Sequence, residues 1–218
     1  SHNMQHLSLL AKCHEQQNVE LHGFEILWPT CCIAQMNTAL VYQARGGKGN
    51  PPVHFHLTNS LLASSTHLMQ QGKGITIVIG NPPYIRYQYL TEEQRAIVSE
   101  IIQENGMKPN KLINIWVCFL VACTKMLSEK GKIAFIIPAE LLQVTYAEEV
   151  RLFLSNQYSK ITLITFKTLV FPDIQQEIVV FIGEKGEEKK GIRIIEMHDL
   201  EDFSNLNLDS NGFVPLQY

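Results

Sequence analysis

The sequence predicts an α/β protein with a mostly parallel sheet and an antiparallel strand near its C-terminal end. Short runs rich in β-branched residues alternate with segments of helical period along the 218 residues. The run Ile75–Ile79 is apolar on both faces, which is typical of a parallel strand buried in a two-sided sheet. Only about eleven residues separate Ile161–Phe166 from Ile178–Ile182, too few for a parallel crossover, so we expect these strands to pair antiparallel.

The composition limits the classes of protein that the chain can represent. With 45% hydrophobic and 18% charged residues, it can bury one sizeable core, and we expect a single domain. A net charge of −3 argues against a free-standing nucleic-acid binder, because phosphates require a basic face, so any DNA contact must come from a local patch or another part. Five cysteines without a C-x-x-C pair, and no apolar span of about 20 residues, predict a cytosolic protein with reduced thiols and no membrane segment.

The N-terminal third predicts two helices and two strands. The second helix follows Pro29, which suits a first helical turn, and carries its apolar residues on one face. The elements are a helix at Met4–Gln17, a strand at Val19–Ile26, a helix from Pro29 to about Gln43 with Ile33, Met36 and Leu40 on its apolar face, and a strand at Val53–Leu57.

The remainder of the chain predicts three helices between further strands. Two of the helices begin with capping boxes, in which a threonine and a residue three positions later satisfy each other's free N–H groups. The elements are a helix capped by Thr91 and Gln94, a helix at Leu112–Leu127 that is apolar almost all round, a turn at 129–131, a strand at Lys132–Ile137, a helix capped by Thr145 and Glu148 that ends near Asn156, and a strand at Ile192–Glu196.

The sequence Asn81-Pro82-Pro83-Tyr84 directly follows the strand at 75–79. Neither proline can donate to a sheet ladder, so the chain leaves the strand in a stiff loop. Ligands of open α/β sheets bind just outside the carboxyl ends of the strands, which is where this loop lies. The Asn81 side-chain oxygen and the Pro82 carbonyl can accept from an exocyclic NH2 group, while Tyr84 stacks on its ring. We therefore expect a binding site for a planar amine.

Two histidines, His54 and His56, share one face of the strand at 53–57. Without a third ligand, such a pair is more typical of packed or solvated side chains than of a metal site. We predict no metal centre.

The order of these elements resembles the TaqI-type, or gamma-class, adenine N6 DNA methyltransferases of restriction-modification systems. The resemblance covers about residues 20 to 185. It rests on I-V-I-G-N-P-P-Y-I-R, the apolar helix, G-K-I-A-F-I-I-P-A-E-L-L, an R-x-F-L helix, and L-V-F-P before I-V-V-F-I. It implies a Rossmann-like sheet that binds S-adenosylmethionine and acts on a flipped adenine in double-stranded DNA, with a restriction endonuclease or a specificity domain or subunit as a possible partner.

The resemblance also implies roles for individual residues. Asn81 and Pro82 hold the adenine amino group, with Pro83 beside them. Tyr84 stacks on the flipped base, and Phe171 closes over it from elsewhere. For S-adenosylmethionine, the implied contacts are Glu25 on the ribose hydroxyls, Ile26 on the adenine ring, and Asn59 on the adenine amine in place of the usual aspartate.

One departure from the family pattern concerns the cofactor loop. The family has a Gly-rich loop, roughly F-x-G-x-G, between its first strand and first helix, and residues 1 to 20 contain no such sequence. We expect the chain to start after this loop and to lack the first strand. The implied organisation is a catalytic core at residues 4–185 that is incomplete at its N-terminal end, followed at 186–218 by a linker or the start of a target-recognition region.

Two other functions fit the same residues. Release-factor glutamine methyltransferases and some RNA methyltransferases also use N-P-P-Y, although the second aromatic in L-V-F-P favours adenine over a glutamine side chain. A non-catalytic remnant or specificity subunit fits the missing Gly-rich loop but does not need Asn81 or Phe171.

Overall fold

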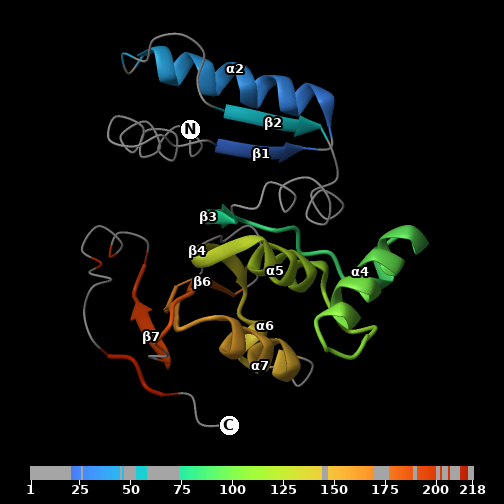
Figure 1. The fold of residues 1–218 in the computed structure, drawn as a ribbon, viewed down its shortest axis with the longest axis vertical. Coiled ribbons are helices and arrows are strands. Elements are labelled where there is room, and N and C mark those ends of the chain that lie inside the picture. The colour runs from blue at the N-terminus through green and yellow to red at the C-terminus, as the bar shows by residue number, and fades with distance from the viewer. Residues whose placement is uncertain are drawn as a thin grey trace. The chain divides into compact units, whose positions relative to one another are not determined.

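A computed structural model of the protein describes residues 21–25, 27–44, 46, 53–57, 74–143, 147–168, 177–188, 191–199, 202, 206 and 212–215. The chain divides into two compact units, Ser1–Ala63 and Ser64–Tyr218, which are called the N-terminal unit and the C-terminal unit below (Figure 1). Each unit contains a β-sheet of its own.

The N-terminal unit contains a β-α-β segment. Strands β1 (Leu21–Glu25) and β2 (Val53–Leu57) pair in parallel, with Glu25 opposite Leu57 at their carboxyl ends. Helix α2 (Trp28–Ala44) packs on both strands (Figure 1). His22 and His54 are opposite each other in the register, and their rings stack with centroids 5.1 Å apart. Both predicted strands are confirmed, whereas the helix predicted at 4–17 lies outside the described residues.

Helix α2 confirms the predicted helix but not the expected role of its apolar face. Cys31, Thr38 and Val41 are the buried residues of this helix. Of the predicted apolar face, Met36 and Leu40 are 65% and 61% exposed. The helical period is therefore correct, but it could not tell which side of the helix the strands cover.

The C-terminal unit contains a mixed five-stranded sheet of order β3-β4-β6-β5-β7. The β3–β4 and β5–β7 pairs are parallel, and β6 is antiparallel to both of its neighbours, which confirms the predicted pairing across the short connection. The strands are β3 (Ile75–Gly80), β4 (Leu127–Pro138), β5 (Lys160–Phe166), β6 (Ile178–Glu184) and β7 (Gly191–Met197).

Helices of this unit begin largely where the sequence predicts them. The capping box of α4 forms in full: Gln94 N donates to Thr91 Oγ1 at 3.2 Å, and Thr91 N donates to Gln94 Oε1 at 3.0 Å. The second capping threonine, Thr145, lies outside the described residues. The helical elements are the 3-10 turn η2 (Tyr87–Tyr89), α4 (Glu92–Glu104), α5 (Ile115–Met126), α6 (Glu140–Gln143) and α7 (Ala147–Gln157).

Helix α5 packs on β4 of this sheet, and α7 also contributes buried residues to the core. Phe135, Phe181 and Leu163 are neighbours in the register of three adjacent strands, and all are buried. Tyr158 packs against Gly183, where an added Cβ would come within 2.7 Å of its ring. The Tyr158 hydroxyl lies 2.6 Å from Thr124 Oγ1 of α5, so this buried pair of polar groups satisfies itself.

Two sequence predictions about this sheet are wrong. Strand β3 is not buried on both faces: it pairs only with β4 among the described strands, and Ile77 and Ile79 are 63% and 67% exposed. An apolar run cannot reveal how many neighbours a strand has. The turn predicted at 129–131 is also absent, because these residues belong to β4, whose pairing with β3 shifts register between Ile75 and Ile77.

Among the helices that the structure describes, none combines the length and apolar character needed to cross a bilayer.

Candidate functional site

The site begins where β3 ends at Gly80. An added Cβ at Gly80 would lie 2.9 Å from Cε1 of Phe135 on β4, so a side chain here would displace a core aromatic ring. Beyond Gly80, the chain runs through the predicted loop, in which Asn81 and Pro83 are exposed and Pro82 is buried. The two prolines restrict the backbone of this loop, and the buried Pro82 fixes it to the unit.

Tyr84 connects the loop to the neighbouring strand. Its hydroxyl lies 2.9 Å from Asn81 Oδ1 and 2.8 Å from the backbone oxygen of Ile136, and it can donate to either. Ile136 directly follows Phe135, which is the register partner of Gly80, so the hydroxyl reaches the carboxyl half of β4. The tyrosine is half-buried, and this burial raises the pKa of Tyr84 to about 12. At neutral pH the hydroxyl is therefore a neutral donor that orients the amide of Asn81.

A second set of backbone contacts anchors the chain after Tyr84. Ile115 N at the start of α5 donates to Ile85 O at 3.0 Å. The next residue, Arg86, forms an antiparallel bridge with Asn114. The loop is thus held by β4 on one side and by the start of α5 on the other.

Phe171, predicted to close over the substrate, lies outside the described residues, but both ends of its loop are defined. Strands β4 and β5 are both antiparallel to β6, so they run in the same direction. The end of β5 at Phe166 therefore points to the edge where β4 ends. On the other side of the loop, Ala139 N donates to Glu177 O at 3.0 Å, just before β6. Both ends reach the edge of the sheet near which Asn81 follows β3.

The residues predicted to bind a cofactor belong to the N-terminal unit. Glu25 is the last residue of β1, at the carboxyl end of a parallel pair. Ile26 and Asn59 lie outside the described residues. The structure thus brings Asn81, Pro82 and Tyr84 together, and the predicted roles of Glu25, Ile26 and Asn59 stay predictions. Within the described part of the chain, no three His, Cys, Asp or Glu side chains are grouped to hold a metal ion.

Two features of the site were missed by sequence reasoning. The contact of Tyr84 with Ile136 joins residues 52 positions apart, and the bridge of Arg86 to Asn114 joins two loops. The sequence signal for the first contact was Pro138, which ends β4 and so indicates that Ile136 lies near the carboxyl end of a strand.

Comparison with known proteins identifies the family. The sequence profile of the Eco57I restriction-modification methylase family matches residues 5–171, which is most of the chain. The chain belongs to this family. The resemblance to methyltransferases of restriction-modification systems that the motifs predict is thereby confirmed, and the residues of the N-P-P-Y loop fall within the part matched to the Eco57I family.

Individual relatives are methyltransferases of the Type II class. The Type II methyltransferase M.HincII of Haemophilus influenzae is 29% identical over 139 residues, covering 62% of this chain and 27% of the relative. M.XamI of Xanthomonas campestris pv. amaranthicola is 28% identical over 137 residues, covering 62% and 25%. The chain spans about a quarter of the length of these relatives.

Solved structures share the fold of this Eco57I-family chain. The DrdV–DNA complex superposes with a TM-score of 0.76 at 17% identity, covering 98% of this chain and 26% of the other. The methyltransferase subunit of a type I restriction-modification system from Streptococcus thermophilus gives 0.61 at 19% identity, covering 83% and 37%. At such identities the likeness concerns the fold alone, a mixed α/β sheet that is partly antiparallel.

Proposed function

We propose that the protein transfers a methyl group from S-adenosylmethionine to the N6 amine of an adenine flipped out of double-stranded DNA, within a restriction-modification system. Membership of the Eco57I methylase family and similarity to Type II methyltransferases support this reaction class. The observation that carries the proposal is the 2.9 Å contact between the Tyr84 hydroxyl and Asn81 Oδ1, beyond the carboxyl end of β3. It fixes an amide acceptor and an aromatic ring in one loop.

Asn81 and Pro82 have the chemistry needed to hold the amine. An amide oxygen has two lone pairs, so Asn81 Oδ1 can accept from Tyr84 and still accept from a substrate NH2 group. The Pro82 carbonyl supplies a second acceptor. The amine of adenine is a poor nucleophile because its lone pair is delocalised into the ring. Two acceptors on its hydrogens favour a more tetrahedral nitrogen, whose lone pair is available to attack the methyl carbon.

Tyr84 replaces part of the stacking that a flipped base loses. Extruding a base costs a few kcal/mol, which an aromatic partner in the site offsets. The 2.8 Å contact with Ile136 O ties the hydroxyl end of the ring to β4, so the ring loses little freedom when a base stacks on it. We propose that Phe171 covers the opposite side of the base. The positions of Phe166 and Glu177, at the two ends of its loop, support this role.

Residues of the N-terminal unit are proposed to hold S-adenosylmethionine. Glu25 would accept from the ribose hydroxyls, Ile26 would pack on the adenine, and the Asn59 oxygen would accept from the adenine amine. The parallel pairing that puts Glu25 opposite Leu57 at the strand ends supports the assignment, because open α/β sheets bind ligands at that edge. When bound, the sulfonium would supply an activated methyl group: its bond to sulfur breaks as the bond to the amine nitrogen forms, S-adenosylhomocysteine leaves, and the surplus proton on nitrogen is lost to water. A Rossmann-like methyltransferase sheet is part of the same proposal.

Substituting Asn81 by alanine tests the proposal. We expect Asn81→Ala to lower methyl transfer by about 100-fold or more, as for the loss of one preorganised hydrogen-bonding group in other active sites. Binding of S-adenosylmethionine, measured by calorimetric titration, should be unchanged. Transfer of tritiated methyl groups to plasmid DNA measures the first effect. Asn156→Ala, an exposed amide on α7, is the matched control and should keep full activity.

The same assay separates the competing functions. If the labelled methyl groups appeared on release factor or ribosomal RNA and not on DNA, the substrate would be another planar group and not adenine in DNA. A wild-type protein that binds no S-adenosylmethionine and transfers nothing would favour a non-catalytic subunit. Full DNA methylation by Asn81→Ala would exclude the proposed role of the loop.

A further inference from the structure

The segment that follows the site, Ile85–Leu90, is firmly held. Ile85 and Arg86 pair with the start of α5 through the 3.0 Å bond from Ile115 N and the bridge to Asn114. Tyr89 N then donates to Arg86 O at 2.9 Å, which closes the 3-10 turn η2. Leu90, at the end of the turn, is buried.

Arg95 of α4 adds side-chain bonds to this turn. Its Nε donates to Tyr87 O at 3.3 Å, and its Nη2 donates to Gln88 O at 2.9 Å. Its guanidinium also lies 5.4 Å from the centroid of the Tyr87 ring. The guanidinium of Arg95 is thus bonded within the protein, and these bonds stabilise the turn. A turn that is already ordered loses little entropy on binding a partner.

The turn and its neighbour present cationic and aromatic side chains to solvent. Arg86 is exposed, and Tyr89 is 73% exposed although it is an aromatic residue. Lys111, also exposed, lies in the turn just before Asn114, the bridge partner of Arg86. Leu112 N donates to Asn110 Oδ1 at 2.9 Å, which orders that second turn. Among the described residues, the side chains of Arg86 and Lys111 have no hydrogen-bond or ion-pair partner.

We propose that Arg86, Tyr89 and Lys111, named the flanking surface, contact the DNA strand beside the flipped adenine; this inference rests on the proposed function. Arg86 and Lys111 bind phosphate oxygens, as a planar fork and a point charge respectively. Tyr89 supplies an aromatic plane for the base next to the vacated position. Arg86 is two residues from Tyr84, so the backbone of the target nucleotide is held next to the site.

The charge distribution favours this local contact. The chain carries a net charge of −3, so the molecule as a whole does not attract DNA. Glu92 and Glu93 are exposed in the first turn of α4, immediately after the flanking surface. These carboxylates repel phosphates, so we expect phosphate contacts at Arg86 and Lys111 and none on the first turn of α4.

Salt-dependent DNA binding tests the flanking surface. The probe is a fluorescein-labelled DNA duplex with A·T pairs, titrated with the purified protein at increasing KCl. Each of Arg86→Ala and Lys111→Ala should reduce the slope of log K against log salt by about 0.9, the value for one phosphate contact. Arg86→Lys keeps the charge and should keep the slope. Tyr89→Ala should lower affinity roughly tenfold at all salt concentrations, and Tyr89→Phe should not.

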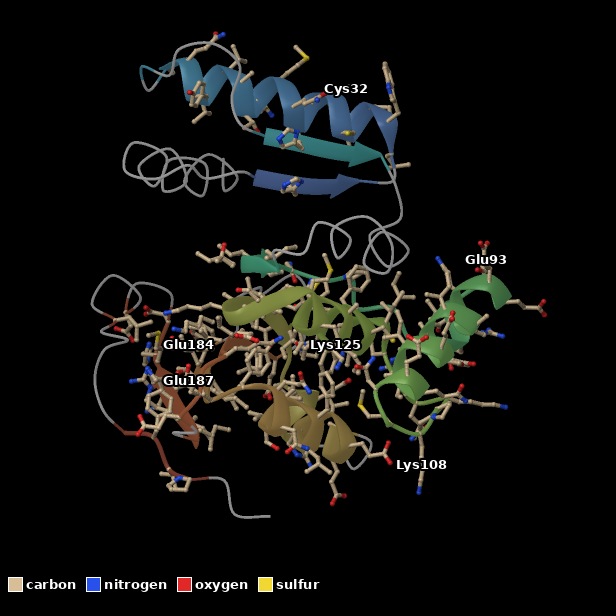
Figure 2. All side chains as sticks on the ribbon, viewed as in Figure 1. Cys32, Glu93, Lys108, Lys125, Glu184 and Glu187 are labelled. Carbon is tan, nitrogen blue, oxygen red and sulfur yellow. The ribbon has the colours of Figure 1, made fainter. Side chains whose placement is uncertain are left out.

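Lys108→Ala is the matched control, because it removes the same charge three residues from Lys111. Lys108 lies in the loop after α4, while Glu93 lies at the opposite end of that helix (Figure 2). An unchanged slope in both Arg86→Ala and Lys111→Ala, or an equal change in Lys108→Ala, would overturn the inference. The variants are compared only if their thermal unfolding matches the wild type. If the alanine substitution disturbs the turn, Arg86→Lys still tests whether a positive charge at this position sets the salt slope.

Methyl transfer by the same preparations separates the two proposals. If the wild-type protein methylates DNA and the variants keep the wild-type salt slope, the proposed role of the flanking surface is wrong and the proposed function stands. If the wild-type protein methylates no DNA, the proposed function is wrong, and the inference loses the substrate on which it rests.

Discussion

Helices α2 and α5 bury their apolar residues to very different extents. Nine of the twelve residues of α5 are buried, against three of the seventeen in α2. Helix α5 packs on β4 of the five-stranded sheet and on α4, whereas the described neighbours of α2 are the strands β1 and β2. A two-stranded sheet covers only a narrow stripe of a helix, so Met36 and Leu40 stay exposed on α2. Apolar composition predicts a helix in both cases, and the number of neighbours decides its burial.

The contrast also concerns the predicted functional residues within each unit. In the C-terminal unit, the packed core holds β3 and β4 in register, and the contact of Tyr84 with Ile136 depends on that register. In the N-terminal unit, the predicted cofactor residue Glu25 ends a strand that has one partner among the described strands. Changes in the large core should therefore affect the loop of Asn81, and changes on the outer face of α2 should not.

The largest expected effect comes from Phe181→Ala. Phe181 is fully buried on the central strand β6, between Phe135 and Leu163, with its ring 5.7 Å from that of Tyr158. Truncation should lower the free energy of unfolding by about 3–5 kcal/mol, because a cavity forms at the centre of the core. Urea unfolding followed by circular dichroism measures the loss. Phe181→Leu should cost clearly less, and an equal loss in both variants would argue against the cavity explanation.

A smaller effect is expected from alkaline pH. Burial raises the pKa of the Cys118 thiol on α5 from its ordinary 9.0 to about 12. Between these values the unfolded chain releases the proton while the folded chain keeps it, so the contribution of this thiol to stability is constant below pH 9.0 and falls as pH rises towards 12. The loss should be roughly 1 kcal/mol per pH unit for this thiol. Urea unfolding at a series of pH values from 9.0 upward measures it.

Cys118→Ala provides the comparison for the pH experiment. The variant lacks the Cys118 thiol but keeps that of Cys123, whose pKa burial also raises to about 12, so its stability should fall with pH, but less steeply than that of the wild type. The buried Tyr158 hydroxyl, whose pKa is also raised by burial, contributes to the slope that remains. Parallel pH profiles for Cys118→Ala and the wild type would show that this thiol does not contribute.

The smallest effect is expected on the outer face of α2. Leu40→Gln and Met36→Gln should each change the free energy of unfolding by less than about 0.5 kcal/mol, as is usual for exposed positions. Val41→Gln, which puts an amide at a buried position of the same helix, is the control and should cost more. A loss in Leu40→Gln as large as that in Val41→Gln would mean that this face is covered in solution.

Local signals in the sequence determined much of this protein. The β-branched run before Asn81, the two prolines after it and the Thr91–Gln94 box act over a few residues, and strand β3, the stiff loop and the capped helix α4 follow from them. The short link between Phe166 and Ile178 excluded a crossover, so the antiparallel pairing of β5 and β6 was also predictable. These features depend on backbone sterics and chain length, which neighbouring residues fix.

The tertiary structure alone decided which faces are covered and which distant groups meet. The exposure of Ile77 and Ile79 depends on how many strands flank β3, and the bond from Tyr84 to Ile136 depends on the register of β4. Both are set by packing between segments far apart in the chain, which hydrophobic periodicity does not encode. The roles of Phe171, Ile26 and Asn59 stay predictions of the sequence, while the pairing of Tyr84 with Asn81 is a property of the folded loop.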